Sequence, residues 1–91
     1  MNITLIKSVE NGWVINYDDV TSDDQGKDIP ITRTVVIEDE YTLNDGSLEH
    51  NKAVQNLLYN IMEILEINQN KHCEYRTFVT IKKQDTGKEI N

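Results

Sequence analysis

The sequence is poor in the residues that cross-link, kink or enlarge small domains. Its 91 residues include one cysteine, one proline and six aromatic residues. The single cysteine, Cys73, cannot form an internal disulfide, on which small secreted domains usually depend. We therefore expect a reducing compartment. The length fits one domain, and so few aromatic residues limit the core to about one helix packed on one sheet.

Long apolar runs are also missing. No stretch approaches the roughly 18 apolar residues that a membrane-spanning helix needs. The first residues, Met1 to Lys7, lack the charged start and the long apolar middle of a signal peptide. We therefore expect a cytoplasmic protein with no membrane partner.

Motifs for catalysis, metal binding and nucleotide binding are absent. Cys73 directly follows His72, and adjacent side chains of an extended segment point to opposite faces, so they do not form a ready nucleophile–base pair. No Cys-x-x-Cys or His-x-x-x-His spacing is present, and the four glycines are isolated. We predict no catalytic residue, no metal ligand and no cofactor, and we expect that the protein is not an enzyme.

Basic residues are scarce in the first half of the chain. Residues 1–50 carry eleven acidic and three basic residues, whereas residues 51–91 carry five and six, for a total charge of −7. A negative field repels phosphate backbones, which disfavours direct binding to nucleic acid. A basic protein partner is compatible with it.

The clearest local pattern is a β-hairpin near the start. Asn11-Gly12 separates two apolar-rich stretches, and both residues tolerate the positive φ of a type I′ turn. We predict strands at 2–10 and 13–20, with Ile6 opposite Tyr17 and Glu10 opposite Trp13. The core face of this hairpin would carry Ile6, Trp13, Ile15 and Tyr17. In the alternative assignment of faces, Ile3, Leu5, Val9 and Val14 would face the core instead.

Three further elements are predicted. A third strand over 31–38 is rich in β-branched residues and follows Pro30. Apolar residues recur at helical spacing over 47–67, with Ser47 as a plausible N-cap. Alternation over 74–83 predicts a last strand. The fold class is therefore α+β, in the order β-β-β-α-β, with an antiparallel sheet of three to four strands and one amphipathic helix on one face. Residues 1–83 form the domain, and residues 84–91 a polar tail that we expect to fray.

Two surfaces are candidates for binding a partner. Loops 18–28 and 38–45 together would form an acidic rim that steers the protein to a basic protein surface, although surplus charge more often serves solubility. Its residues would be Asp18, Asp19, Asp23, Asp24, Asp28, Glu38, Asp39 and Glu40. The sheet face away from the helix would be open, and an exposed apolar patch there would suit a dimer or another partner. Its residues would be Ile3, Leu5, Val9 and Val14.

The sequence also resembles small acidic phage and prophage proteins. The matching features are the hairpin motif Gly12-Trp13-Val14-Ile15-Asn16-Tyr17, the leucine-rich helix from Leu48 to Ile67, and Lys71-His72 before the last strand. The resemblance implies no activity and no site residue. It implies an accessory factor, located in the host cytoplasm, that binds a host protein.

Our leading hypothesis is therefore a small acidic protein, encoded by a phage, that occupies a basic surface of a host protein, as a nucleic-acid mimic would. The alternative is a homodimer with a structural or regulatory role. A small enzyme or ligand-binding protein is the third reading, and a cleft lined by His72, Cys73 and a carboxylate would favour it.

Overall fold

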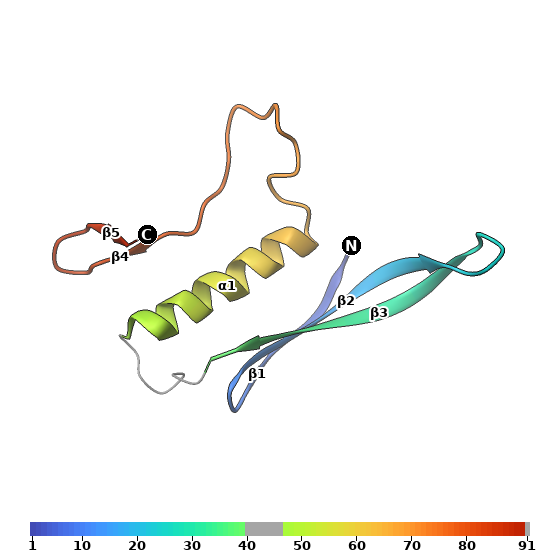
Figure 1. The fold of residues 1–91 in the computed structure, drawn as a ribbon, viewed down its shortest axis with the longest axis horizontal. Coiled ribbons are helices and arrows are strands. Elements are labelled where there is room, and N and C mark those ends of the chain that lie inside the picture. Colours follow the sequence, from blue (N-terminus) through green and yellow to red (C-terminus); the bar gives the residue numbers. More distant parts are fainter. Residues whose placement is uncertain (40–46, 91) are drawn as a thin grey trace.

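The computed structural model describes residues 1–39 and 47–90, and the acidic residue Glu40 lies outside them. Three strands, one helix and two short strands follow one another along the chain (Figure 1). Their bounds are β1 Ile3–Val9, β2 Gly12–Ser22, β3 Asp28–Glu38, α1 Leu48–Ile64, β4 Ile81–Lys82 and β5 Glu89–Ile90. Strands β1, β2 and β3 form an antiparallel sheet in that order, so the α+β prediction is confirmed.

The last predicted strand is shorter than the sequence pattern indicated. The prediction of a continuous strand over 74–83 is wrong, because only Ile81–Lys82 pair as β4. Their partner is β5, which comes from the predicted tail, and the two form a separate two-stranded sheet. Side chains, rather than a neighbouring strand, hold the backbone of residues 77 and 79, as described below.

The hairpin between β1 and β2 forms with a different register. Ile6 lies opposite Ile15 and Val9 opposite Gly12, so Glu10 and Asn11 make the turn and the predicted Asn11-Gly12 turn is wrong. Gly12 is drawn into β2 because it also pairs with Glu38 of β3. The register differs from the predicted one by two residues. Since side chains alternate between faces with period two, the predicted faces of β2 survive the shift.

Close approach of β3 explains why this strand position holds a glycine. A Cβ atom on Gly12 would lie 1.9 Å from the carbonyl oxygen of Ile37, and the φ of Gly12 is +144°. An L side chain fits neither that space nor that backbone conformation.

The core lies where α1 covers one face of the sheet. Ile15, Ile37 and Ile64 are its buried members. The partly buried residues packed against them are Ile3, Trp13, Tyr17, Val35, Leu57 and Ile61. The predicted core face of β2 is therefore confirmed, whereas Ile6 lies on that face but is 46% exposed on the edge strand.

An irregularity in β1 moves one predicted surface residue into the core. The pairing of β1 with β2 shifts between Ile3 and Leu5, so Ile3 lies opposite Tyr17. Ile3 consequently packs against the core instead of joining the open face, where it was predicted. The shift is of the kind that a β-bulge produces, since one extra residue reverses the side-chain alternation beyond it.

Helix α1 has a defined cap at each end. Ser47 Oγ accepts a hydrogen bond from the His50 backbone N–H at 3.1 Å, as predicted for an N-cap. At the other end Glu66 takes a φ of 60°, and its N–H donates to Glu63 O while that of Ile67 donates to Met62 O. This pair of bonds is a Schellman motif. It ends the helix at Ile64, three residues before the predicted end.

The chain is extended for its length. Its radius of gyration is 16.6 Å, against about 12 Å for a compact domain of this size. In Figure 1 the sheet lies on one side of α1, and the segment from the helix end to β4 lies on the other. The C-terminal third of the chain therefore adds little to the core, all of whose residues lie between Ile3 and Ile64.

Candidate functional site

The candidate site is the segment of residues 74–82, which we call the C-terminal arm; it starts at a bend at Glu74 and ends in β4. Its first attachment is to Asn68, just beyond the end of α1. The Asn68 Nδ2 donates to the Thr77 carbonyl at 2.6 Å, and the Thr77 N–H donates to Asn68 Oδ1 at 3.0 Å. Asn68 has a φ of 68°, a left-handed conformation that Asn tolerates better than most residues. Its side chain thus binds Thr77 as a neighbouring strand would.

The second attachment is made by two side chains one turn apart on α1. The Tyr59 hydroxyl donates to the Val79 carbonyl at 3.0 Å and accepts from the Val79 N–H at 3.2 Å. The Gln55 Nε2 donates to the same carbonyl at 2.9 Å. Gln55 and Tyr59 are spaced i and i+4, so they lie on one side of the helix. Polar side chains therefore hold the arm to α1.

These attachments occupy only one edge of the arm. In an extended strand the backbone groups of alternate residues point to opposite edges. Thr77 and Val79 use the edge that faces α1, and the Lys83 N–H, which donates to Lys88 O at 2.9 Å, uses the same edge to bind β5. Within the described residues, no hydrogen bond involves the backbone of the alternate residues Arg76, Phe78 and Thr80. The second edge of the arm is therefore open.

Two aromatic side chains of the arm are exposed. Tyr75 is 83% exposed and Phe78 is 70% exposed. Exposed large apolar side chains of this kind, next to an unpaired strand edge, are typical of surfaces that bind other proteins. The arm thus combines free backbone groups with apolar side chains.

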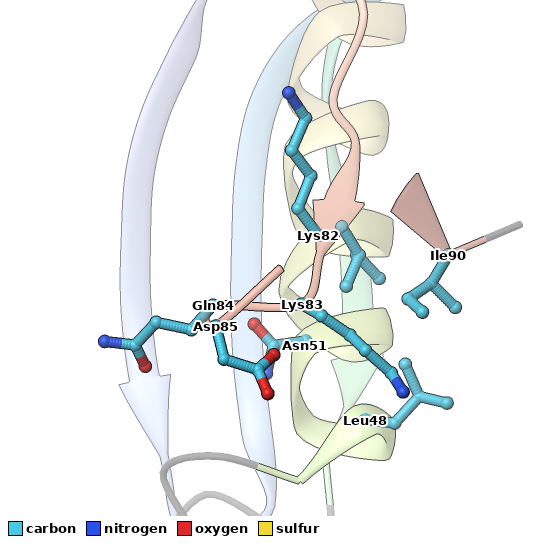
Figure 2. Close-up of a pocket in the computed structure, with 8 residues that line it drawn as sticks. Leu48, Asn51, Lys82, Lys83, Gln84, Asp85 and Ile90 are labelled. Carbon is cyan, nitrogen blue, oxygen red and sulfur yellow. The ribbon is translucent and has the colours of Figure 1, made fainter. Parts of the chain in front are cut away.

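A groove lies where the arm ends, between the first turn of α1 and the β4–β5 hairpin (Figure 2). Its volume is about 780 Å³, and it is open to solvent on one side. Leu48 and Ile90 give it apolar walls, and Lys83 and Asp85 place opposite charges at its border. No histidine or cysteine side chain lines this groove, so it is not the cleft with His72 and Cys73 that would favour an enzyme.

The acidic residues fall into two groups that lie far apart. Strands β2 and β3 pair over their full length, from Gly12 opposite Glu38 to Ser22 opposite Asp28. The acidic residues of segment 18–28 lie at and near the second end, and Glu38 and Asp39 at the first. Eleven-residue strands separate the two ends by about 33 Å. The structure therefore does not bring these described residues together as a single rim.

In the acidic group near the end where Ser22 pairs with Asp28, one carboxylate already forms an ion pair. The Arg33 guanidinium donates to the Asp19 carboxylate, which also accepts from the Val20 N–H at 2.7 Å. The hydrogen bond from Arg33 is the main reason that the pKa of Asp19 is lowered from its ordinary 3.8, and the bond from Val20 lowers it further. Asp23 Oδ1 accepts from the N–H groups of Gln25 and Lys27 and so orders the turn.

The acidic group at the other end, where Gly12 pairs with Glu38, contains a buried carboxylate. Asp39 is 3% exposed, and its Oδ2 lies 2.6 Å from Nδ1 of His50 in the first turn of α1. Its backbone N–H donates to Asn11 O at 2.7 Å. Asp39 was predicted to contact a partner, but burial leaves it no access to one. The pair instead ties the end of β3 to the start of α1.

The open sheet face is only partly apolar. Leu5 and Val9 are exposed there, and Val14 lies opposite Val36, which is 61% exposed. Lys7 also lies opposite Val14 on the β1 side, so a charged side chain lies among the apolar ones on this face. Three of the four residues predicted for this surface are on it, and Ile3 is not.

The residues considered for catalysis are dispersed. Cys73 and His72 are exposed in the loop after α1, whereas His50 lies in the first turn, so the length of the helix separates them. Among residues 1–39 and 47–90, no group of three or more His, Cys, Asp or Glu side chains has the geometry to hold a metal ion.

Sequence reasoning missed the residues that position the arm. The sequence pattern indicates only that Gln55 lies on the polar side of the helix and that Asn68 lies in the segment that ends it, and it gives no role to Tyr59. The available signal was weak: an aromatic hydroxyl one turn after an amide, both on the polar side of α1. These side chains act because the backbone of residues 77 and 79 lies next to them in the folded chain. The spacing of residues along the sequence does not predict that contact.

Comparison of the chain with models of protein families, with curated proteins and with solved structures found no match. In the part of the chain that the structure describes, no helix has both the length and the apolar character to cross a membrane.

Proposed function

We propose that this protein acts by binding another protein, and that the C-terminal arm is the binding element. The observation that carries the proposal is the open edge of the arm beside the exposed rings of Tyr75 and Phe78. An extended segment with free N–H and C=O groups binds a partner by strand addition, in which backbone bonds supply affinity and side chains supply specificity.

The way the arm is held supports this proposal. Bonds from Asn68 and Tyr59 fix residues 77 and 79 in an extended conformation before any partner arrives. A strand that is already extended loses less conformational entropy on binding than a flexible segment does. The arm is therefore pre-organised on one edge and free on the other.

The acidic end of the β2–β3 hairpin supplies a second element of the proposal. Asp23, Asp24 and Asp28 lie at one end of the long sheet, away from the arm, and Asp18 lies four residues before that end of β2 (Figure 1). Exposed charges of one sign accelerate association with an oppositely charged surface. A basic partner protein fits this arrangement, and an inhibitor of a host protein encoded by a phage, which the sequence resemblance implies, is one form that such a factor takes.

The proposal is tested by capture from a lysate of the organism that encodes the protein, with two matched variants. Phe78→Glu changes the arm, and Val36→Glu places the same charge on an apolar residue of the sheet that is also largely exposed. We expect a specific partner to be captured by the wild-type protein and by Val36→Glu, and lost with Phe78→Glu. Equal capture by all three proteins would contradict the role of the arm.

A further inference from the structure

We propose that the partner of the arm is the arm of a second copy of this chain, paired antiparallel about a two-fold axis through Phe78. This inference rests on the proposed function, because it uses the same open edge. The acidic end of the β2–β3 hairpin, which suits a basic partner, takes no part in it. Since Arg76, Phe78 and Thr80 point their backbone groups to that edge, Phe78 would pair with its own copy and Arg76 with Thr80 of the partner. Both pairs are then of the hydrogen-bonded kind.

Side-chain complementarity favours this register. When Phe78 lies opposite itself, Glu74 lies opposite Lys82 of the second copy, and the symmetry makes this ion pair twice. Tyr75 lies opposite Ile81, and Thr77 opposite Val79. Aromatic–aromatic, aromatic–aliphatic and opposite-charge pairs are the cross-strand pairs that stabilise antiparallel sheets.

Neighbouring registers are less favourable. In any register that uses the same edge, Arg76, Phe78 and Thr80 still pair with even-numbered residues of the second copy. The two-fold axis can therefore move only in steps of one residue. Moving the axis by one residue towards the C-terminus places Arg76 opposite Lys82, and like charges directly opposite each other are destabilising. Moving it by one residue towards the N-terminus leaves Glu74 opposite Thr80 and Lys82 opposite His72, so the ion pairs are lost.

The shape of the molecule leaves room for this pairing. In Figure 1 the arm lies on the side of α1 away from the sheet, so α1 separates the arm from the sheet. Nine residues a side make an interface below the standard size of about 800 Å² per partner. We therefore expect a weak, reversible dimer.

The test uses sedimentation equilibrium of the full chain from about 5 μM to 1 mM, with charge reversals at the predicted ion pair. Glu74→Lys and Lys82→Glu each turn two attractive pairs into repulsive ones, and we expect each to weaken the dimer about tenfold. An equimolar mixture of the two variants restores both ion pairs in a heterodimer, so its association should return to the wild-type value. Phe78→Glu should abolish the dimer.

Lys83→Glu is the matched control, because it changes the net charge as Lys82→Glu does but lies opposite Cys73 in the proposed register. Its dimer should be close to wild type in strength. Circular dichroism of each variant checks that the fold is retained. In the wild-type dimer, the Phe78 amide should exchange hydrogen more slowly at 1 mM than at 5 μM, while the Thr77 amide should not change.

The possible results separate the two proposals. Equal weakening by Lys82→Glu and Lys83→Glu, or a mixture that stays monomeric, would overturn the register. A wild-type monomer at 1 mM would overturn self-pairing. In that case loss of a captured partner with Phe78→Glu would still uphold the proposed function, whereas unchanged capture would overturn both.

Discussion

The Asp39 carboxylate lies 2.6 Å from Nδ1 of His50, and this contact joins the last strand of the main sheet to the first turn of the only long helix among the described residues. A buried carboxylate that loses a hydrogen-bonding partner loses part of what offsets its desolvation. The pair therefore determines how firmly α1 is fixed at the β3 end of the sheet.

We expect His50→Ala to lower the free energy of unfolding by about 2 kcal/mol, because the Asp39 carboxylate would remain buried without this partner. Urea denaturation followed by circular dichroism measures the change. Asn51→Ala, next to it on an exposed position of the same turn, is the control and should cost less than about 1 kcal/mol. A loss for His50→Ala as small as that of the control would show that the pair is not a structural link.

Gly12→Ala should destabilise the protein by at least about 2 kcal/mol. The added Cβ meets the Ile37 carbonyl, which belongs to backbone and cannot move without disturbing the β2–β3 pairing. Gly26→Ala provides the comparison, since Gly26 also has a positive φ but no atom lies within 4 Å of its added Cβ. Its expected cost is about 1 kcal/mol. Similar losses at both positions would mean that φ alone, and not the contact with β3, requires glycine at position 12.

Glu66→Gly should stabilise the protein by about 1 kcal/mol, because Glu66 holds the left-handed position of the Schellman motif that glycine occupies without steric cost. Thermal denaturation measures this as a higher melting temperature. Glu63→Gly, one turn earlier inside α1, should instead cost about 1 kcal/mol. A lower melting temperature for Glu66→Gly would show that this end of the helix is not strained.

The pKa of Asp19 should rise towards 3.8 when Arg33 is replaced by Gln. Arg33 lowers the pKa by favouring the ionised carboxylate in the folded protein. Such a group stabilises the fold above pH 3.8, and this stabilisation is lost as the pH falls through the lowered pKa of the folded state. NMR titration of the side-chain carboxyl carbon gives the value directly. Lys27→Gln is the control, and an unchanged Asp19 pKa in Arg33→Gln would contradict the ion pair.

Tyr59→Phe should accelerate amide hydrogen exchange at Val79 while leaving Thr77 unchanged. The hydroxyl of Tyr59 is the acceptor of the Val79 N–H, and Asn68 is that of Thr77. Exchange is measured by NMR at low protein concentration. Asn68→Ala should give the reverse pattern. If either variant released both amides together, the two attachments would form one cooperative unit.

The elements that depend on local chemistry could be predicted from the sequence. The β-branched run before Glu38 forms β3, and Ser47 caps a helix whose apolar spacing is regular. The faces of β2 were predictable despite the wrong turn, because a register shift of two residues leaves alternation intact. The predictions that were wrong concern features that depend on contacts between residues far apart in the sequence. Gly12 looked like a turn residue because glycine is common in turns, and only the approach of Ile37 shows why it lies in a strand.

The candidate site was the least predictable part. Alternation over residues 74–83 indicated a strand, and the arm is indeed extended where Thr77 and Val79 are held, but its partners are side chains that no periodic pattern reveals. The charge of the sequence identified the acidic residues, but it did not show that they form two groups at different places on the sheet. The distance between the two groups is set by the length of the β2–β3 pairing. That length depends on the register of the two strands, which the amino-acid composition does not predict.

Every residue of the apolar core belongs to the first 64 positions, and the arm is attached from outside by polar bonds. Substitutions at the exposed positions of residues 74–82 therefore meet few packing constraints, whereas Val79 and Ile81 are partly buried. A lineage can alter what the arm recognises without first having to rebuild the domain that carries it, so specificity and foldability are free to evolve at different rates in this chain.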